Sequence, residues 1–204
     1  AMLDKIERQQ ELERDNNYRF NHLHTIGRHI EDALRNKLGS ELIQVDKPKK
    51  DEDGVIADDV QNGQDIIIRV KSGGDWQEVF YVEVKSKWDF SEPAHMSTRQ
   101  VRMASLHSNE YALCCVDLRE HKNKDLANLP EEVIINCTNV KMDIGKDLHP
   151  MLKGILDADE RSEDEQIKIS EYRSNMSAKV FEQGEAFYVL LSKIEDIVAL
   201  KLYQ

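Results

Sequence analysis

The 204-residue sequence predicts an α/β (α+β) fold in which helices flank a mixed central sheet. Strands are indicated by runs rich in β-branched and aromatic residues at 66–70, 79–85 and 111–116. Helices are indicated by apolar residues that recur with a helical period at 26–38 and 97–107. With one more strand expected before the first of these runs, the elements follow the order α-β-β-β-α-β.

The N-terminal part predicts two helices. Residues 3–18 are highly charged and carry a thin apolar stripe, which we expect to be the tail of a longer helix from an upstream region. Thr25 is expected to cap a second helix, whose apolar face begins at Ile26 and which ends at Gly39.

A first strand is expected at residues 41–45, followed by a charged loop at 46–64. Asp58 and Asp59 lie in this loop without a periodic pattern around them. Solvation is therefore a better interpretation for both residues than metal binding.

The hairpin that follows holds the chemically most informative residues. Asp65 opens its first strand, residues 73–75 mark its turn, and Glu83 and Lys85 share one face of its second strand because side chains alternate. Carboxylates from two adjacent strands can hold one Mg²⁺, and Lys85 could orient a water or neutralise charge on a phosphate. The alternative is a cross-strand ion pair on a solvated face, and spacing alone leaves both interpretations open.

The order of Asp65, a hairpin turn, the triplet Glu83-Val84-Lys85, a polar loop and a helix resembles the PD-(D/E)XK, or restriction-endonuclease-like, nuclease superfamily. The series is most similar to the branch named after the C-terminal domain of the protein NO VEIN. Gln64 stands where the superfamily name has proline. The resemblance implies a nuclease that uses Mg²⁺ or Mn²⁺, with Asp65 and Glu83 as metal ligands and Lys85 as a further catalytic residue.

The resemblance adds two supporting residues. The first core helix of the superfamily contributes a glutamate, and Glu31 matches it; otherwise Glu31 would pair with Arg28 or Arg35 at helical spacing. Gln100 lies in the first turn of the helix at 97–107, where it could reach a metal-bound water. The alternative for Gln100 is an ordinary polar helix face.

Lys87, Arg99 and Arg102 are the predicted nucleic-acid contacts, because their cationic groups suit phosphate oxygens. The net charge of −11, however, is unlike that of a strong freestanding DNA binder. We therefore expect the isolated domain to bind DNA weakly, with targeting by an upstream domain or a partner protein, and we also consider a homodimer.

The cellular location is predicted from three features that the sequence lacks. It has no apolar run long enough to span a membrane, and its N-terminus lacks a signal-peptide pattern. Its three cysteines, two of them adjacent at Cys114 and Cys115, form neither a disulfide framework nor a metal-binding pattern. A cytoplasmic location is expected.

The C-terminal third carries no second catalytic pattern. A short helix is expected at 144–155, and strands are expected at 133–137 and 167–172. The apolar runs at 186–191 and 197–202 are interpreted as strands that extend the sheet.

Three regions follow from these patterns: a helical extension at 1–24, a nuclease-like core at 25–140 and a C-terminal α/β extension at 141–204. We expect the core to be a Mg²⁺-dependent DNA endonuclease domain of a larger protein, with defence as one setting. The alternatives are an inactive nuclease-like module that binds nucleic acid or protein in a larger assembly, and a structural adaptor whose three key charges are surface ion pairs.

Overall fold

The computed structural model describes residues 2–42, 54–59, 64–88, 94–142, 144, 153–154, 156–158 and 173–203. Its helices are α1 (Met2–Leu42), α2 (Thr98–Leu106), α3 (Glu131–Asn136), α5 (Lys179–Glu182) and α6 (Phe187–Leu202), with 3₁₀ turns at Arg119–His121 and Leu126–Asn128. Its strands are β1 (Gly54–Asp59), β2 (Ile66–Lys71), β3 (Gln77–Lys87), β4 (His95–Ser97), β5 (Tyr111–Asp117), β6 (Thr138–Met142), β7 (Arg173–Asn175) and β8 (Glu185–Ala186).

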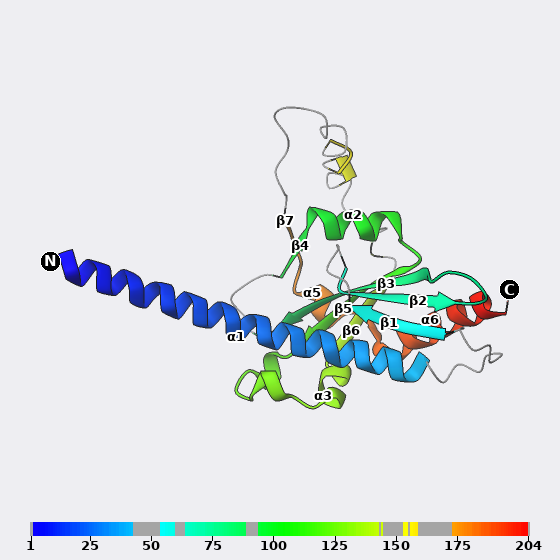
Figure 1. The fold of residues 1–204 in the computed structure, drawn as a ribbon, viewed down its shortest axis with the longest axis horizontal. Coiled ribbons are helices and arrows are strands. Elements are labelled where there is room, and N and C mark those ends of the chain that lie inside the picture. Colours follow the sequence, from blue (N-terminus) through cyan, green and yellow to red (C-terminus); the bar gives the residue numbers. More distant parts are fainter. Residues whose placement is uncertain are drawn as a thin grey trace.

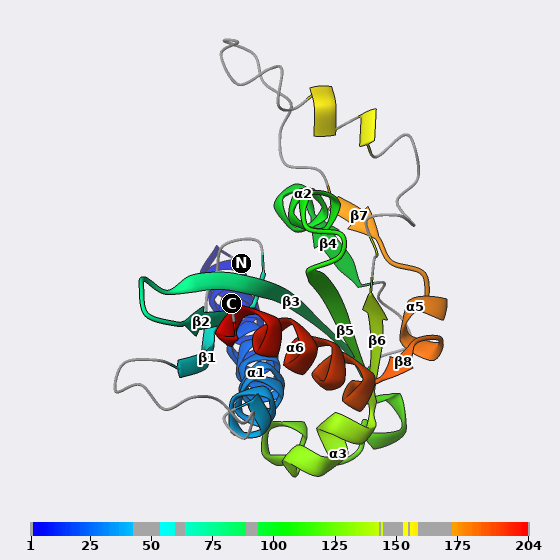
Figure 2. The same cartoon turned by 90° about the vertical axis from the view of Figure 1, so that its right-hand side faces the viewer.

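A six-stranded mixed sheet forms the centre of the molecule, in the order β1-β2-β3-β5-β6-β8 (Figure 1). Helices α1, α3 and α6 pack on one face, while α2 and α5 lie on the other (Figure 2). Strands β4 and β7 form a separate antiparallel pair beside α2. The predicted α/β class, with helices flanking a mixed sheet, is confirmed.

The predicted hairpin is present. Strands β2 and β3 are antiparallel with Ile66 opposite Val82, and Gly73 in the turn has a φ of 67°, a conformation that favours glycine. The predicted alternation also holds, because Phe80 and Val82 lie in the core beneath α1 and α6 whereas Tyr81 lies in the core beneath α2. Strand β3 then pairs in parallel with β5, which is buried almost throughout.

The prediction of two N-terminal helices is wrong, because α1 runs without a break from Met2 to Leu42. Thr25 is not an N-cap: its hydroxyl donates to the carbonyl of Asn21 (2.9 Å), as threonine does in a helix interior. Gly39 lies inside the same helix. The strand predicted at 41–45 is wrong for the two residues that α1 includes, and the rest of it lies outside the described residues.

The first strand of the sheet is β1, which occupies part of the predicted loop at 46–64. It pairs with β2, so that Asp59 lies opposite Ile66. Asp58 and Asp59 are ion-paired rather than simply solvated: Asp58 contacts Arg69, and Asp59 lies 2.6 Å from Arg28. With β1 in this place, the predicted order α-β-β-β-α-β is recovered from α1 to β5, with the short β4 inserted before α2.

The predicted strands of the C-terminal third are wrong where the structure describes them. Most of 133–137 lies in α3, and the strand β6 follows it. The runs at 186–191 and 197–202 lie almost entirely within α6, whose buried residues recur every three or four positions, as Leu190, Ile194 and Val198 do. The strand predicted at 167–172 and most of the helix predicted at 144–155 lie outside the described residues.

No helix in the described part of the chain is long and apolar enough to cross a lipid bilayer.

Candidate active site

The β2–β3 hairpin brings Asp65 and Glu83 together. Ile66 is opposite Val82, so Asp65 and Glu83 are the next facing pair and lie on the same side of the sheet. The backbone of Asp65 donates to the carbonyl of Val82 (3.0 Å), and its carboxylate accepts from the backbone amide of Val84 (2.7 Å). These bonds hold the Asp65 side chain against the strand that carries Glu83.

Glu83 is completely buried, with an exposed fraction of 0 %. One of its oxygens, Oε1, lies 2.6 Å from Lys85 Nζ and also accepts from the side-chain amide of Gln100. The other oxygen, Oε2, is buried and has no hydrogen-bond partner among the described residues. A buried carboxylate oxygen is costly when nothing compensates it, so this atom suits a cation or a proton as its partner.

Helix α2 positions Gln100 through its N-terminal cap. The Ser97 hydroxyl accepts from the backbone amide of Gln100 (3.3 Å), and the Gln100 side-chain oxygen accepts from the backbone amide of Ser97 (2.9 Å). This capping box leaves the NH₂ group of Gln100 to bind Glu83. Val101 and Ala104 are buried and anchor the helix on the sheet, whereas Leu106 is 70 % exposed.

Helix α1 contributes Glu31 from the other side. Its carboxylate lies 3.2 Å from Arg28, and Arg28 also binds Asp59 on β1 at 2.6 Å. The alternative pairing of Glu31 with Arg28 is therefore present in the structure. The glutamate nevertheless lines the same pocket as Asp65.

The three carboxylates repel one another in a partly desolvated space. Burial, followed by the charge of Asp65, raises the pKa of Glu83 to about 8. Burial and then Asp65 likewise raise the pKa of Glu31 to about 7, and burial raises the pKa of Asp65 itself. By contrast, the hydrogen bond from Arg28 lowers the pKa of Asp59. Without a cation the cluster therefore holds protons at neutral pH that an ordinary glutamate would have lost, and its full negative charge develops only at higher pH.

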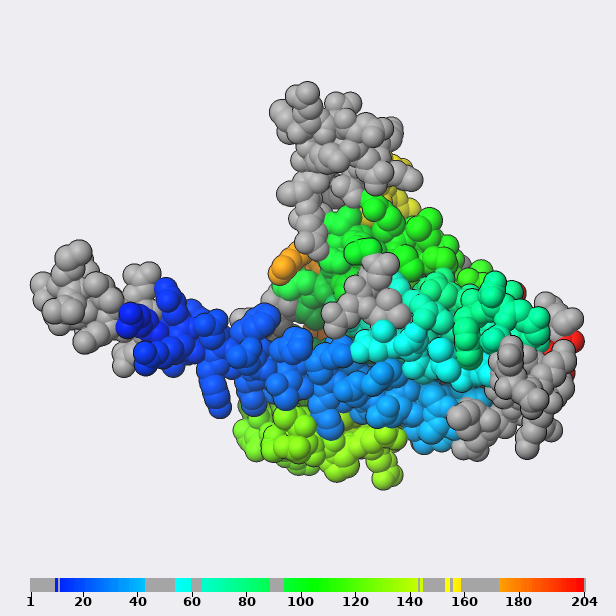
Figure 3. Space-filling view, viewed as in Figure 1, coloured from blue at the N-terminus to red at the C-terminus, as the bar shows by residue number. Residues whose placement is uncertain are grey.

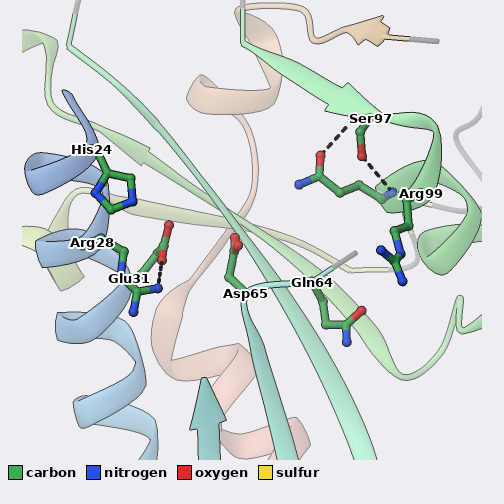
Figure 4. Close-up of a pocket in the computed structure, with 9 residues that line it drawn as sticks. His24, Arg28, Glu31, Gln64, Asp65, Ser97 and Arg99 are labelled. Carbon is green, nitrogen blue, oxygen red and sulfur yellow. Dashed lines mark hydrogen bonds and ion pairs between the residues drawn. The ribbon is translucent and has the colours of Figure 1, made fainter. Parts of the chain in front are cut away.

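A pocket of about 450 Å³ opens over Asp65. Figure 4 shows His24, Arg28 and Glu31 of α1 on one side of Asp65, and Ser97 and Arg99 from the start of α2 on the other. Gln64, which is only 4 % exposed, forms part of its floor, and its side-chain oxygen has no partner among the described residues. The pocket is therefore a polar space between two helices, with carboxylates at its base.

The donor set at this base fits a divalent cation of the Mg²⁺ type. Such ions take oxygen ligands and keep several waters, so two carboxylates suffice as protein ligands. The partnerless Oε2 of Glu83 and the raised pKa values of Glu83 and Asp65 are what a site built around a positive charge would show without that charge. Within the described ranges, no three His, Cys, Asp or Glu side chains converge closely enough to form a complete metal cage.

The predicted nucleic-acid contacts are distributed unevenly. Arg99 lines the pocket. Lys87 ends β3 two residues beyond Lys85, and Arg102 lies one turn further along α2; both are half-buried and neither lines the pocket. The pocket thus brings together Glu31, Asp65, Arg99 and Gln100 of the predicted site, with Glu83 and Lys85 directly behind them.

Sequence reasoning missed the contribution of α1 upstream of Glu31. His24, Gly27 and Arg28 line the pocket. His24 could not be assigned to it while the helix was expected to begin at Thr25, and Arg28 was considered only as an ion-pair partner of Glu31. It also missed Tyr111, which is fully buried at the start of β5 and whose hydroxyl has no partner within the described residues. Burial, followed by the charge of Glu83, raises the pKa of Tyr111 well above its ordinary range.

Comparison with known proteins identifies one family. Residues 40–127 match the model of the family described as Protein NO VEIN, C-terminal. The match includes Asp65, Glu83, Lys85 and Gln100, whereas Glu31 lies just outside it. No curated protein matches the chain, and no solved structure does. The family predicted from the hairpin motif is thereby confirmed for residues 40–127.

Proposed function

Because residues 40–127 form a nuclease-like domain of the NO VEIN C-terminal family, we propose that the chain hydrolyses phosphodiester bonds of nucleic acid with the help of Mg²⁺ or Mn²⁺. DNA is the expected substrate, cleaved internally. Asp65 and Glu83 would hold the cation, and Lys85, Gln100 and Glu31 would act beside it.

The observation that carries the proposal is the buried Oε2 of Glu83, which has no hydrogen-bond partner in the described part of the chain, on a carboxyl group whose pKa the neighbouring Asp65 helps to raise. Two carboxylates in a desolvated space are unfavourable unless a cation or a proton is shared between them. A purely structural ion pair between Glu83 and Lys85 would not need Asp65 beside it. This argues against the adaptor interpretation.

A bound divalent cation would supply a polarised water and neutralise charge on the scissile phosphate. Residues of the chain would stabilise charge on the phosphate, accept a proton and hold the metal ligands in place. Lys85 Nζ, held 2.6 Å from Glu83, presents a positive charge where negative charge develops on the phosphate oxygens. Glu31, with a pKa of about 7, can accept a proton near neutral pH. Gln100 holds Glu83 in place through its side-chain amide.

An inactive nuclease-like module is the second candidate. It is favoured by the double engagement of Glu83 Oε1 by Lys85 and Gln100, and by the net charge of −11. Such a module would bind nucleic acid or protein partners and would leave phosphodiester bonds intact.

The test is a cleavage assay on plasmid, linear duplex, single-stranded DNA and RNA, each with Mg²⁺, Mn²⁺, Ca²⁺ or EDTA. Lys85→Met should lower the cleavage rate at least about 100-fold, while calorimetry still detects Mn²⁺ binding. Lys201→Met removes an exposed lysine from α6 and serves as the control. Cleavage by Lys85→Met at the rate of the unaltered protein would refute the assigned mechanism, and no cleavage under any condition would favour the inactive module.

A further inference from the structure

A single stripe of α1 leads from solvent to the carboxylate cluster. Phe20, His24, Gly27 and Glu31 follow one another at spacings of four, three and four residues. At about 100° per residue, all four lie within one narrow arc of the helix surface. Three of them, His24, Gly27 and Glu31, line the pocket over Asp65. We call these four residues the α1 stripe.

The outer end of the α1 stripe is an aromatic side chain without a packing role. Phe20 is 68 % exposed, and its ring stacks on that of His24 with centroids 6.3 Å apart. Figure 3 shows this half of α1 projecting from the body of the molecule. Because the ring is exposed beside a residue that lines the pocket, it is available to stack on a flat ligand group that extends out of the pocket.

Gly27 leaves the middle of the α1 stripe open. A Cβ atom placed on it would meet no atom within 4 Å, so packing does not require glycine there. Glycine weakens the interior of a helix compared with alanine. Its position on the pocket wall therefore suggests that something approaches the helix backbone closely at this point.

The opposite wall and floor offer polar groups that suit a nucleotide. Arg99 faces the α1 stripe across the pocket (Figure 4), and the partnerless side-chain oxygen of Gln64 lies on the floor between the walls. A volume of about 450 Å³ suits one small ligand unit. A duplex would require a large, strongly basic surface, which is difficult to reconcile with a net charge of −11.

We propose that the α1 stripe binds single-stranded nucleic acid, with one nucleotide in the pocket and a neighbouring base stacked on Phe20 and His24. The inference rests on the proposed function, since it places the scissile phosphate at Asp65. It specifies the substrate as an unpaired strand. The bases of such a strand can stack on aromatic rings, and its binding needs fewer basic side chains than the binding of a duplex does. DNA and RNA share this chemistry.

The experiment measures the fluorescence anisotropy of labelled eight-nucleotide single strands, in DNA and RNA form, and of the corresponding DNA duplex. Ca²⁺ replaces Mg²⁺ so that the cluster is neutralised while cleavage is suppressed. Phe20→Ala should weaken binding of the single strand at least about fivefold, because stacking of one base is lost. Gly27→Leu should weaken it at least as much by filling the pocket wall, although the helix itself should become more stable.

The chain provides matched controls for both variants. Tyr18 is 76 % exposed and stacks on His22 as Phe20 does on His24, but it lies about 160° around the helix from Phe20. Tyr18→Ala should therefore leave binding unchanged. Gly39→Ala makes the same kind of change in α1 away from the pocket, where the new Cβ would meet only Ala57 at 3.8 Å.

Equal binding by Phe20→Ala and Tyr18→Ala would overturn the inference. So would binding of the duplex as tightly as the single strand, or no binding of any oligonucleotide, which would leave Phe20 as a contact for a protein. The comparison of DNA with RNA identifies which strand is preferred. If the predicted pattern of binding appears but no cation supports cleavage, the inference stands and the proposed hydrolysis fails, so the two are separable.

Discussion

Replacing Asp65 with asparagine should stabilise the protein in the absence of divalent cations. The pKa of Glu83 is about 8 in the folded protein against an ordinary value of 4.5, so its ionisation costs on the order of 5 kcal/mol more in the folded state than in the unfolded state. Burial is the largest cause and Asp65 the second, so we assign about 1–2 kcal/mol to the charge of Asp65. The amide of Asp65→Asn can still accept from the backbone of Val84 and can donate to Glu83.

The measurement is thermal unfolding at about pH 9 in EDTA, above the pKa of Glu83 in the natural protein, so that its carboxylate is mostly charged beside Asp65. Asp65→Asn should raise Tm by roughly 2–8 °C for a protein of this size. Asp75→Asn changes an exposed aspartate in the hairpin turn and should leave Tm nearly unchanged. Millimolar Mg²⁺ should then raise the Tm of the natural protein but not that of Asp65→Asn, because a cation that binds only the folded state stabilises it.

A lower Tm for Asp65→Asn than for the natural protein in EDTA would refute the reasoning. It would mean that the Asp65 carboxylate stabilises the fold, for example through Lys85, rather than destabilising it by repulsion of Glu83. Equal stabilisation of both proteins by Mg²⁺ would also contradict it, since the cation would then bind elsewhere.

Three further predictions test the surroundings of the site. Folding raises the pKa of Glu83 to about 8 and that of Glu31 to about 7, so the protonated forms of both groups favour the folded state. The contribution of these groups to the free energy of unfolding of the metal-free protein should be greatest below about pH 4.5 and should fall as the pH rises to about 8. Urea titrations at several pH values would measure this fall. Gln100→Ala removes both the capping box with Ser97 and the bond to Glu83, and should cost about 1–2 kcal/mol in chemical denaturation; retention of full stability would show that neither bond matters. Gly73→Ala, in the hairpin turn with φ of 67°, should cost about 1 kcal/mol with no change in Mn²⁺ affinity by calorimetry.

The central hairpin was predictable because its signals are local. Alternation along β3 placed Glu83 and Lys85 on one face, and a turn containing Gly73 fixed the antiparallel pairing that brings Asp65 to Glu83. The helix at 97–107 was predictable for the same reason, and in the structure Ser97 caps it. The hydrogen bond from Gln100 to Glu83 could not be predicted from the sequence, because it joins residues 17 positions apart and depends on how α2 packs on the sheet.

The errors arose where short runs were interpreted without their longer period. The two apolar runs at the C-terminus have the lengths of strands, but their buried residues Leu190, Ile194 and Val198 keep a spacing of four across the polar residues between them. The segment after Pro130 is similar: acidic residues at Glu131 and Glu132 suit the first turn of a helix, which α3 then forms. In both places the helical pattern extended beyond the short apolar run that was predicted to be a strand.

The continuity of α1 connects the core of the protein to its proposed substrate path. Ile26, Ile30 and Leu34 are essentially inaccessible to solvent, so the inner half of α1 is held in the core in one orientation. An α-helix without a break transmits that orientation along its length, because each residue is rotated by a constant angle from the last. The direction in which Phe20 faces is therefore set by residues buried about two to four turns further along the helix. A helix that began at Thr25, as the sequence first indicated, would have left the carboxylate cluster without this extended wall.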